Sequence, residues 1–231
     1  MIDQFVQTYA RGEVRSRGAI AAARRRPAIL DAAMTVIARH GLSGTTIERV
    51  ARAASMSPGT VVFHFATKDA LLAATLAAVA GEFDSARRRA FEAGDPAASL
   101  DALIATTFDP RISDPRKIAV WYAFWGEAKP RAAYMAQVGG LDAAYHQDLL
   151  RLVTRLAAEG GYAGVDAEAA TYGFAGLLEW LWQESLTEGR RFDRKRAMTI
   201  ARRYLASLFP RHFAMPAARG PATNDQKWRQ R

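Results

Sequence analysis

The spacing of the apolar residues is the feature that most limits the possible folds of this chain. From residue 24 to residue 209 the apolar residues recur three and four positions apart, as they do along one face of an amphipathic helix. The strand-like alternation of apolar and polar residues does not occur in this stretch. Pro and Gly divide it into separate segments. The sequence therefore predicts an all-α fold.

The expected helices differ in length along the chain. Two very short helices are predicted near the front, and the longer ones follow. The full set is 26–40, 46–53, 58–64, 68–92, 97–108, a helix that opens at Pro115, a short segment over 131–137 that ends at Gly139-Gly140, 141–158, 167–187 and 194–208. This order predicts a small helical domain over residues 24–68 and a larger one over residues 69–213.

The charge of the chain is concentrated at its two ends. Residues 1–68 carry ten Lys or Arg against four Asp or Glu, residues 211–231 carry five against one, and the segment between them is nearly neutral. Such a distribution indicates that one end binds a polyanion. The sequence has no cysteine, no apolar run long enough to span a membrane and no signal-peptide pattern, so we expect a cytoplasmic protein without a membrane partner.

The stretch "GLSGTTIERVARAASMSPGTVVFHFATKDALL" (residues 41–72) carries the most chemical information. Thr45 and Glu48 have the spacing of a capping box at a helix start. Ser57 is placed to cap the next helix, with Pro58 in its first turn. Two short helices with a tight turn between them form a helix-turn-helix, whose second helix enters the major groove of DNA. By spacing alone, an ordinary helical hairpin fits as well.

The segment "TTIERVARAASMSPGTVVFHFATKDALL" resembles the N-terminal signature of the TetR family of one-component repressors, and the resemblance covers roughly residues 28–72. It implies an N-terminal three-helix domain that binds DNA. Small residues permit close approach to DNA, and helix N-termini and lysine favour phosphate. The DNA-binding residues that the resemblance implies are Thr45, Thr46, Ser57, Pro58, Gly59, Thr60, His64 and Lys68. Either Phe63 or Phe65 is expected to fill the small core.

The chain departs from the family pattern inside the helix-turn-helix. Ser55 stands where the family usually has glycine, and Val62 stands where it often has tyrosine. Residues 57–64 contain no Arg, Asn or Gln that could read a base edge through two hydrogen bonds. Selectivity is then expected from the hydroxyls of Ser57 and Thr60, from apolar contacts to thymine methyl groups and from DNA shape.

Two basic segments flank the predicted domains. Residues 1–23 are predicted to be a flexible arm, whose arginines either reach DNA or remain solvated. The arginines nearest the first helix, Arg24 to Arg26, are the ones we expect to touch DNA. Residues 214–231 have little hydrophobic periodicity and are predicted to be a disordered tail.

The TetR resemblance also implies a ligand-binding domain behind the fourth helix, and a symmetric dimer interface formed by the last two long helices. The periodicity of residues 141–158 and 167–187 suits such packing. We therefore expect a homodimer on a palindromic operator of double-stranded DNA. The interface residues that we expect are Leu149, Leu152, Leu156, Leu178, Leu181 and Ser185.

The back half resembles the choline-responsive betaine-pathway repressors of this family. The segments "FDPRISDPRKIAVWYAFWGEA" and "AGLLEWLWQESL" carry this resemblance. It implies a small-molecule effector such as a quaternary amine, which aromatic faces and a carboxylate would hold. The candidate ligand residues are Phe108, Trp121, Trp125, Tyr145, Phe174, Glu179 and Trp180. The subgroup has a small residue where Trp180 stands, which leaves choline itself open.

Two questions stay open at the level of the sequence. Trp121, Phe124 and Trp125 share one helix face, and such a stripe either lines a pocket or fills a core. The effector could also be a different hydrophobic or aromatic molecule, or the chain could be a ligand-independent DNA-binding module. The scattered histidines and the lack of a phosphate-binding glycine loop or nucleophile elbow argue against an enzyme, and we expect neither a metal nor a cofactor.

Overall fold

The computed structural model describes residues 25–126 and 128–213, without the side chains of 128–137. The predicted arm over residues 1–23 and the predicted tail over residues 214–231 lie outside the described residues. A first helix spans residues 25–44. It is followed by α2 (Ile47–Ala53), α3 (Pro58–Phe65), α4 (Lys68–Phe91), α5 (Pro96–Thr107), α6 (Pro115–Gly126), α7 (Ala128–Glu159), α8 (Ala167–Glu188), the short 3-10 helix η1 (Gly189–Arg191) and α9 (Arg194–Leu208). The described residues form no strand, so the predicted all-α class is confirmed.

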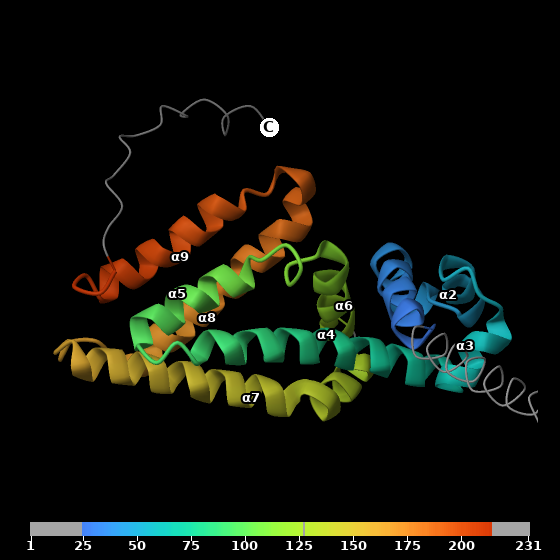
Figure 1. Ribbon diagram of the computed structural model, residues 1–231, viewed down its shortest axis with the longest axis horizontal. Coiled ribbons are helices and arrows are strands. Elements are labelled where there is room, and N and C mark those ends of the chain that lie inside the picture. The colour runs from blue at the N-terminus through green and yellow to red at the C-terminus, as the bar shows by residue number, and fades with distance from the viewer. Residues whose placement is uncertain (1–24, 127, 214–231) are drawn as a thin grey trace, which may run out of the picture.

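The helices form a small head and a larger body, which α4 connects (Figure 1). The first helix, α2 and α3 lie at one end of α4. Along the rest of its length α4 packs against α5 and α7, while α8 packs against α7 and α9. The short α6 contacts α4, α7 and α8 and lies on the side of the body that faces the head.

Buried apolar side chains form three clusters, and α4 contributes to each of them. Leu71 belongs to the core of the head, which also contains Val61 and Phe65 of α3. Leu76 belongs to a second cluster that joins the first helix to α4, α6 and α7. Ala90 belongs to the large core of the body. The proposed domain boundary after residue 68 thus falls at the start of α4, and this helix joins the head to the body because it contributes to all three clusters.

Side-chain caps fix several helix starts, among them the start of α3 that the sequence predicts. The Ser57 side chain accepts from the backbone N–H of Thr60, with Pro58 in the first turn of α3, and Asp166 and Asp193 cap α8 and α9 in the same way. The predicted capping box of Thr45 and Glu48 is wrong. Helix α2 begins one residue later than that motif requires, with Thr46 as its N-cap and the N–H of Arg49 as the donor, at 3.2 Å.

The predicted break at Gly139-Gly140 is also wrong, because α7 runs unbroken through both glycines. Glycine inside a helix costs about 1 kcal/mol relative to alanine, which is too little to end a helix that is packed on both sides of the site. Val138 is buried in the cluster shared with the first helix, and Leu149 is buried in the body. Tertiary packing therefore overrides the local signal.

The length and the hydropathy of the described helices show whether any of them could span a membrane. None of them is by itself both long and apolar enough to cross a bilayer. The length and composition of a span are reached only by α3 and α4 taken together, and this pair is bent by 70°.

Candidate DNA-binding surface and ligand cavity

The turn between α2 and α3 is built around a residue in the left-handed conformation. Ser55 has a φ of +55°, and the N–H of Met56 donates back to the carbonyl of Ala51 at 2.8 Å, which closes the end of α2. This is the position at which the TetR pattern has glycine. Glycine adopts this conformation without a steric penalty, whereas serine is strained in it. The departure seen in the sequence is therefore a strained position in the fold.

Helix α3 has one face in the core of the head and one face in solvent. Val61 and Phe65 are buried, whereas Val62 and Phe63 are exposed, Phe63 to 85%. Phe65 is therefore the ring that fills the small core. The guanidinium of Arg26 lies 4.5 Å from the centre of the Phe65 ring, and its Nη1 donates to the carbonyl of His64 at 3.3 Å. These contacts hold α3 against the first helix.

The residues implied in DNA binding lie at the start of α3 and beside it. Ser57, Pro58 and Gly59 are exposed, and Thr60 is half-buried. A methyl group added at Gly59 would meet only the Ser57 hydroxyl, at 3.9 Å, so the fold itself does not require glycine there. Glycine at this position leaves room for the close approach of an outside partner. Thr46, His64 and Lys68 are half-buried, and Lys68 Nζ donates to the carbonyl of Ser43 at 3.3 Å.

Thr45 is misplaced in the sequence prediction. Its side chain is fully buried, and its hydroxyl donates to the carbonyl of Gly41 at 2.7 Å. Because the N-cap of α2 is Thr46, the preceding threonine points into the head instead of towards DNA. Of the two threonines, only Thr46 remains a candidate for a contact with the DNA backbone.

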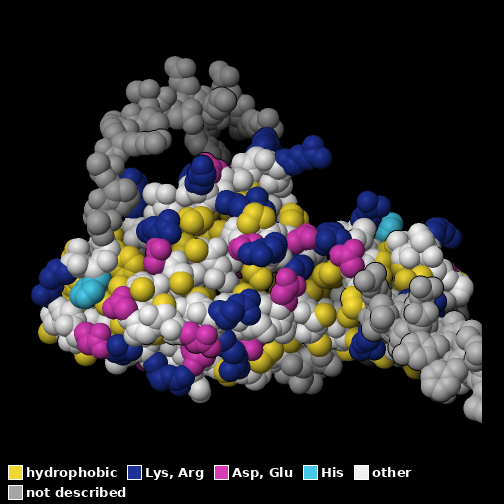
Figure 2. All heavy atoms as spheres, in the orientation of Figure 1, with side chains coloured by type: hydrophobic (Ala, Val, Ile, Leu, Met, Phe, Trp, Pro, Cys, Tyr) yellow, Lys and Arg dark blue, Asp and Glu magenta, His cyan; other side chains and the backbone are white. Residues whose placement is uncertain are grey.

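The surface of the head is basic. Residues 25–68 contain six Lys or Arg and two Asp or Glu. Arg25, Arg49 and Arg52 are exposed, and Figure 2 shows Lys and Arg side chains on this end of the molecule. Such a surface attracts the phosphate backbone of DNA irrespective of its sequence.

A cavity of about 310 Å³ lies between α4, α5, α6, α7 and α8, and its wall is mostly aromatic. It is lined by Phe83, Thr107, Trp121, Tyr122, Trp125, Asp142, Tyr145, His146, Ala175, Leu178, Glu179 and Trp182. This volume is near the lower end of the range of small-molecule sites, so a small ligand fits best. Four of the predicted ligand residues line it, namely Trp121, Trp125, Tyr145 and Glu179.

Three predicted ligand residues do not line this cavity. Phe108 is buried against Phe192, and Phe174 is buried and stacks on Tyr204, with 6.2 Å between the ring centres. Trp180 is 64% exposed on the outer side of α8. Residues two positions apart on a helix lie about 200° from each other, so Trp182 faces inward where Trp180 faces outward. The indole of Trp182 donates to the carbonyl of Thr107 at 2.8 Å and is thereby held in the wall.

Sequence reasoning missed several residues of the wall, above all Phe83, Tyr122, Asp142, His146 and Trp182. On α6 it grouped Phe124 with the two tryptophans. Phe124 does not line the cavity and is instead buried in the cluster shared by the first helix, α4, α6 and α7. A usable signal was present on α8, where Ala175, Leu178, Glu179 and Trp182 follow the spacing of one helix face.

The electrostatics of the cavity favour a positive ligand. The carboxylates of Asp142 and Glu179 belong to its lining. Burial, and next to it the negative charge of Glu179, raise the pKa of the Tyr122 hydroxyl to about 12. Burial also raises the pKa of Tyr145, with a further contribution from Glu179 and an opposing one from Arg87. Both phenols therefore stay neutral, and the fixed charges of the lining are negative.

The buried guanidinium of Arg87 packs against Tyr145, which lines the cavity. Arg87 of α4 is 1% exposed and pairs with Asp84 at 2.5 Å and with Asp148 of α7 at 2.9 Å. Its guanidinium lies 5.4 Å from the centre of the Tyr145 ring. The two carboxylates compensate its charge, so Arg87 joins α4 to α7 without making the cavity positive.

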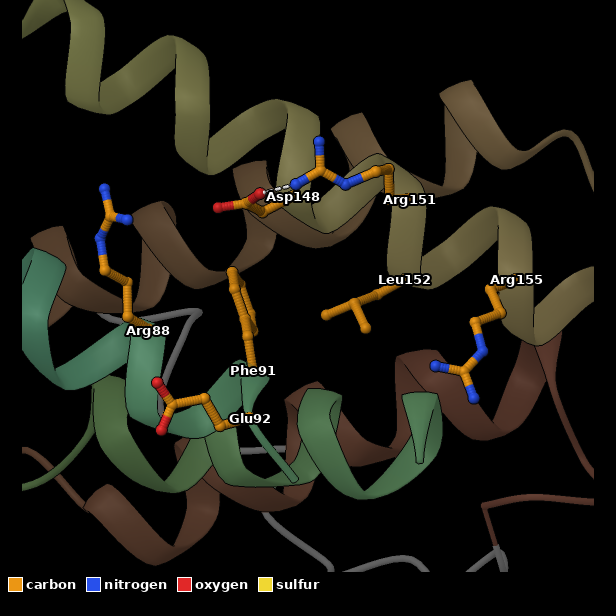
Figure 3. A pocket seen from close by; sticks show the side chains of 7 residues that line it. All are labelled: Arg88, Phe91, Glu92, Asp148, Arg151, Leu152 and Arg155. Atoms are coloured by element: carbon orange, nitrogen blue, oxygen red, sulfur yellow. Dashed lines mark hydrogen bonds and ion pairs between the residues drawn. The ribbon is translucent and has the colours of Figure 1, made fainter. Parts of the chain in front are cut away.

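A second, open groove of about 470 Å³ lies between α4 and α7, and Figure 3 shows its lining. Phe91 and Leu152 form an apolar floor, and Arg88, Arg151 and Arg155 surround it. Each arginine is paired within the chain, with Asp84, Asp148 and Glu159 respectively. Basic and acidic side chains also alternate over this face in Figure 2. The groove is thus open and lined mainly by charged side chains that pair with each other, and the aromatic cavity is the better candidate for a small ligand.

The residues predicted for the dimer interface lie elsewhere than expected. Leu149, Leu156, Leu178, Leu181 and Ser185 are buried within the chain, and Leu152 belongs to the floor of the open groove. The prediction of the five buried residues as interface residues is therefore corrected, because the apolar stripes of α7 and α8 pack against the rest of the body, while that of Leu152 stays a prediction. The outer face of α8 instead exposes Tyr172, to 61%, and Trp180.

The comparisons with known proteins agree with both halves of this description. The family described as "Bacterial regulatory proteins, tetR family" matches residues 29–75, and the one described as "BetI-type transcriptional repressor, C-terminal" matches residues 96–210. The chain is 36% identical over 188 residues to the HTH-type transcriptional regulator BetI of Paraburkholderia xenovorans (strain LB400), covering 78% of this chain and 91% of that protein. The chain belongs to the TetR family. It is a DNA-binding transcriptional regulator of BetI type and not an enzyme.

Solved structures have the same fold. A TetR transcription regulator from Haloarcula marismortui ATCC 43049 superposes with a TM-score of 0.67 at 22% identity, over 80% of this chain and 98% of that one. AibR, solved in complex with isovaleryl coenzyme A and operator DNA, superposes with a TM-score of 0.62 at 21% identity, again over 80% and 98%. At these identities the likeness concerns the fold alone.

Proposed function

We propose that this TetR-family regulator is a cytoplasmic repressor, which binds a palindromic operator as a homodimer and is released from it by a small cation in the aromatic cavity. The observation that carries the effector part is the joint presence of several rings and two carboxylates around one small cavity. Each contact between a cation and a ring contributes about 0.5–2 kcal/mol, and a nearby carboxylate adds charge attraction. A quaternary amine such as choline has the size and the charge for this site.

The proposed dimer rests on the outer face of α8. Tyr172 and Trp180 are large, exposed and two turns apart, with Gly176 between them on the same face and open space beside it. Exposed aromatic side chains around small residues permit close packing of a second copy, and α9 lies beside α8 to widen the surface. A symmetric dimer would also place two copies of α3 on successive turns of the major groove, about 34–36 Å apart.

The proposed release passes through α6. This helix carries Trp121, Tyr122 and Trp125 of the cavity wall, and it contacts the first helix of the head through Arg116. A ligand that shifts α6 would therefore act on the head directly. Such coupling requires that the ligand bind one arrangement of the heads better than the other.

Selection of random DNA duplexes on the full chain tests the operator, because a homodimer should recover a palindrome. Recovery of no motif would contradict the repressor. Sedimentation equilibrium in the absence of DNA tests the dimer separately.

Calorimetry with choline, betaine aldehyde and related amines tests the effector, together with operator release by each ligand. The matched control is 3,3-dimethyl-1-butanol, which has the shape of choline without its charge. Binding of choline but not of this alcohol supports the cationic site. Equal binding of both supports the second candidate, a regulator of a neutral apolar ligand, for which the aromatic wall is the motivating observation.

A further inference from the structure

The solvent face of α3 is apolar along its whole length. Pro58, Gly59, Val62 and Phe63 are exposed, and so is Ala66 directly after the helix. Gly59, Val62, Phe63 and Ala66 follow the spacing of one helix face, which lies beside the face of the buried Val61 and Phe65. The aromatic ring of Phe63 is 85% exposed, the most exposed among the large apolar side chains of the described residues.

The polar groups at the start of α3 are engaged with each other. The Ser57 hydroxyl accepts from the N–H of Thr60 at 3.2 Å, and the two hydroxyls lie 2.9 Å apart in hydrogen-bond contact. His64 is half-buried, with its ring 5.3 Å from that of Phe63. Reading of a base edge by the Ser57 oxygen would therefore compete with the capping of the helix.

The apolar feature that bases present in the major groove is the methyl group of thymine. An exposed ring on a helix that enters this groove loses contact with water when it meets such a methyl group, and the binding free energy improves. A cytosine or a guanine in the same place would offer polar groups that an apolar side chain leaves without partners.

We infer that Val62 and Phe63 select the operator by contacting thymine methyl groups. The inference rests on the proposed function, since it assumes that α3 lies in the major groove. Charge complementarity supports DNA as the occupant of this face, because Arg49 and Arg52 are exposed on the adjacent α2 and Arg25 on the first helix. Phosphate contacts position the head, and the apolar pair supplies the selectivity.

The test replaces thymine by deoxyuridine, which removes the methyl group and keeps the base pair. The probes are duplexes of the operator recovered by selection, with each thymine replaced in turn and symmetrically in both half-sites. Binding of the full chain is measured by fluorescence anisotropy at a fixed salt concentration. At one or two positions of each half-site we expect the affinity to fall on the order of three- to tenfold.

Variants of Phe63 assign the effect to this side chain. Because the side chain is exposed, Phe63→Ala is expected to fold, which circular dichroism checks. This variant should bind the thymine operator more weakly and should no longer distinguish thymine from deoxyuridine at the positions concerned. Phe63→Leu keeps an apolar side chain and should retain part of the discrimination.

Each result has one interpretation. Unchanged affinity for every deoxyuridine duplex overturns the inference and leaves the proposed repressor intact. Equal discrimination by the wild type and by Phe63→Ala overturns it as well. If selection recovers no motif, the proposed function fails, and the inference fails with it.

Discussion

Arg116 of α6 donates from Nη1 to Asp31 Oδ1 of the first helix at 3.1 Å, and from the same nitrogen to the hydroxyl of Thr35 at 3.1 Å. Its other guanidinium nitrogens hold Asp114 at the start of α6. Burial of Asp114 opposes ionisation, but the hydrogen bonds from Arg116 lower the pKa of this carboxyl below its ordinary value. One side chain thus connects the helix with the cavity rings to the helix that supports α3.

Replacement of Arg116 by alanine should weaken the communication between the two sites. Both partners of the Arg116–Asp31 pair are more than a third exposed, so we expect the loss of this pair to cost less than about 1 kcal/mol of stability. The free energy of coupling between effector and operator is typically about 1–3 kcal/mol, and in this variant we expect a smaller value. The measurement is operator affinity with and without the effector that the amine panel identifies.

The matched control for this variant is Arg111→Ala. Arg111 is an exposed arginine that pairs with Asp109 in the loop before α6. If Arg116→Ala released the operator with the same ratio of affinities as the wild type and this control, the Arg116 contact would not transmit the signal.

The strained turn of the head offers a stabilising change. Ser55→Gly should relieve the left-handed conformation, which costs a residue with a side chain about 1–2 kcal/mol, against a loss of about 0.5–1 kcal/mol from the more flexible unfolded chain. The net gain of about 0.5–1 kcal/mol corresponds to a rise in Tm of about 1–4 °C. Thermal unfolding followed by circular dichroism measures it. Ser55→Ala is the control, because it keeps the Cβ atom and should give no such rise.

The helix starts were predictable from sequence, because capping is a local interaction. Ser57 is followed directly by a proline, and this pair alone is enough to place the start of α3. The one-residue error at Thr45 arose because two threonines stand side by side and the local pattern does not tell which of them lies inside. Only the packing of the head against Gly41 decides that.

The faces of α8 were less predictable, because this helix is apolar on two sides. Leu178 and Trp182 point into the body, while Tyr172 and Trp180 point out of it. A helix with two apolar faces satisfies the same periodicity in either orientation. The choice is made by partners far away in the sequence, such as the carbonyl of Thr107 that accepts from Trp182. For this reason the cavity was predicted with the wrong tryptophan.

The pair of Asp109 and Arg111 should contribute to stability in a pH-dependent way. Hydrogen bonds from the Arg111 side chain, above all, lower the pKa of Asp109 from 3.8 to about 2. The folded state therefore holds the proton of this carboxyl more weakly than the unfolded state does. The resulting stability is complete above pH 3.8 and is lost as the pH falls towards about 2.

Thermal unfolding of the wild type and of Asp109→Asn at a series of pH values measures this contribution. The difference in Tm should be largest near neutral pH and should shrink below pH 3.8. Because Arg111 is exposed and water screens the pair, we expect this difference in Tm to be small. A difference that stayed constant down to the lowest pH at which the protein is folded would contradict this account.

Alanine substitutions of two partly exposed tryptophans should affect dimer formation and ligand binding separately. Trp125 lines the cavity and is 45% exposed, and Trp180 lies on the outer face of α8 and is 64% exposed. Trp125→Ala should weaken the binding of a quaternary amine by about 0.5–2 kcal/mol, the value of one cation–π contact, while the protein stays dimeric. Trp180→Ala should weaken the dimer and lower operator affinity, because two heads are needed to hold both half-sites. Calorimetry measures the first effect and sedimentation equilibrium the second.

Each variant is the control for the other, since both remove an indole from a partly exposed site. If Trp180→Ala lost amine binding and stayed dimeric, Trp180 would belong to the ligand site. The proposed dimer interface on the outer face of α8 would then be wrong.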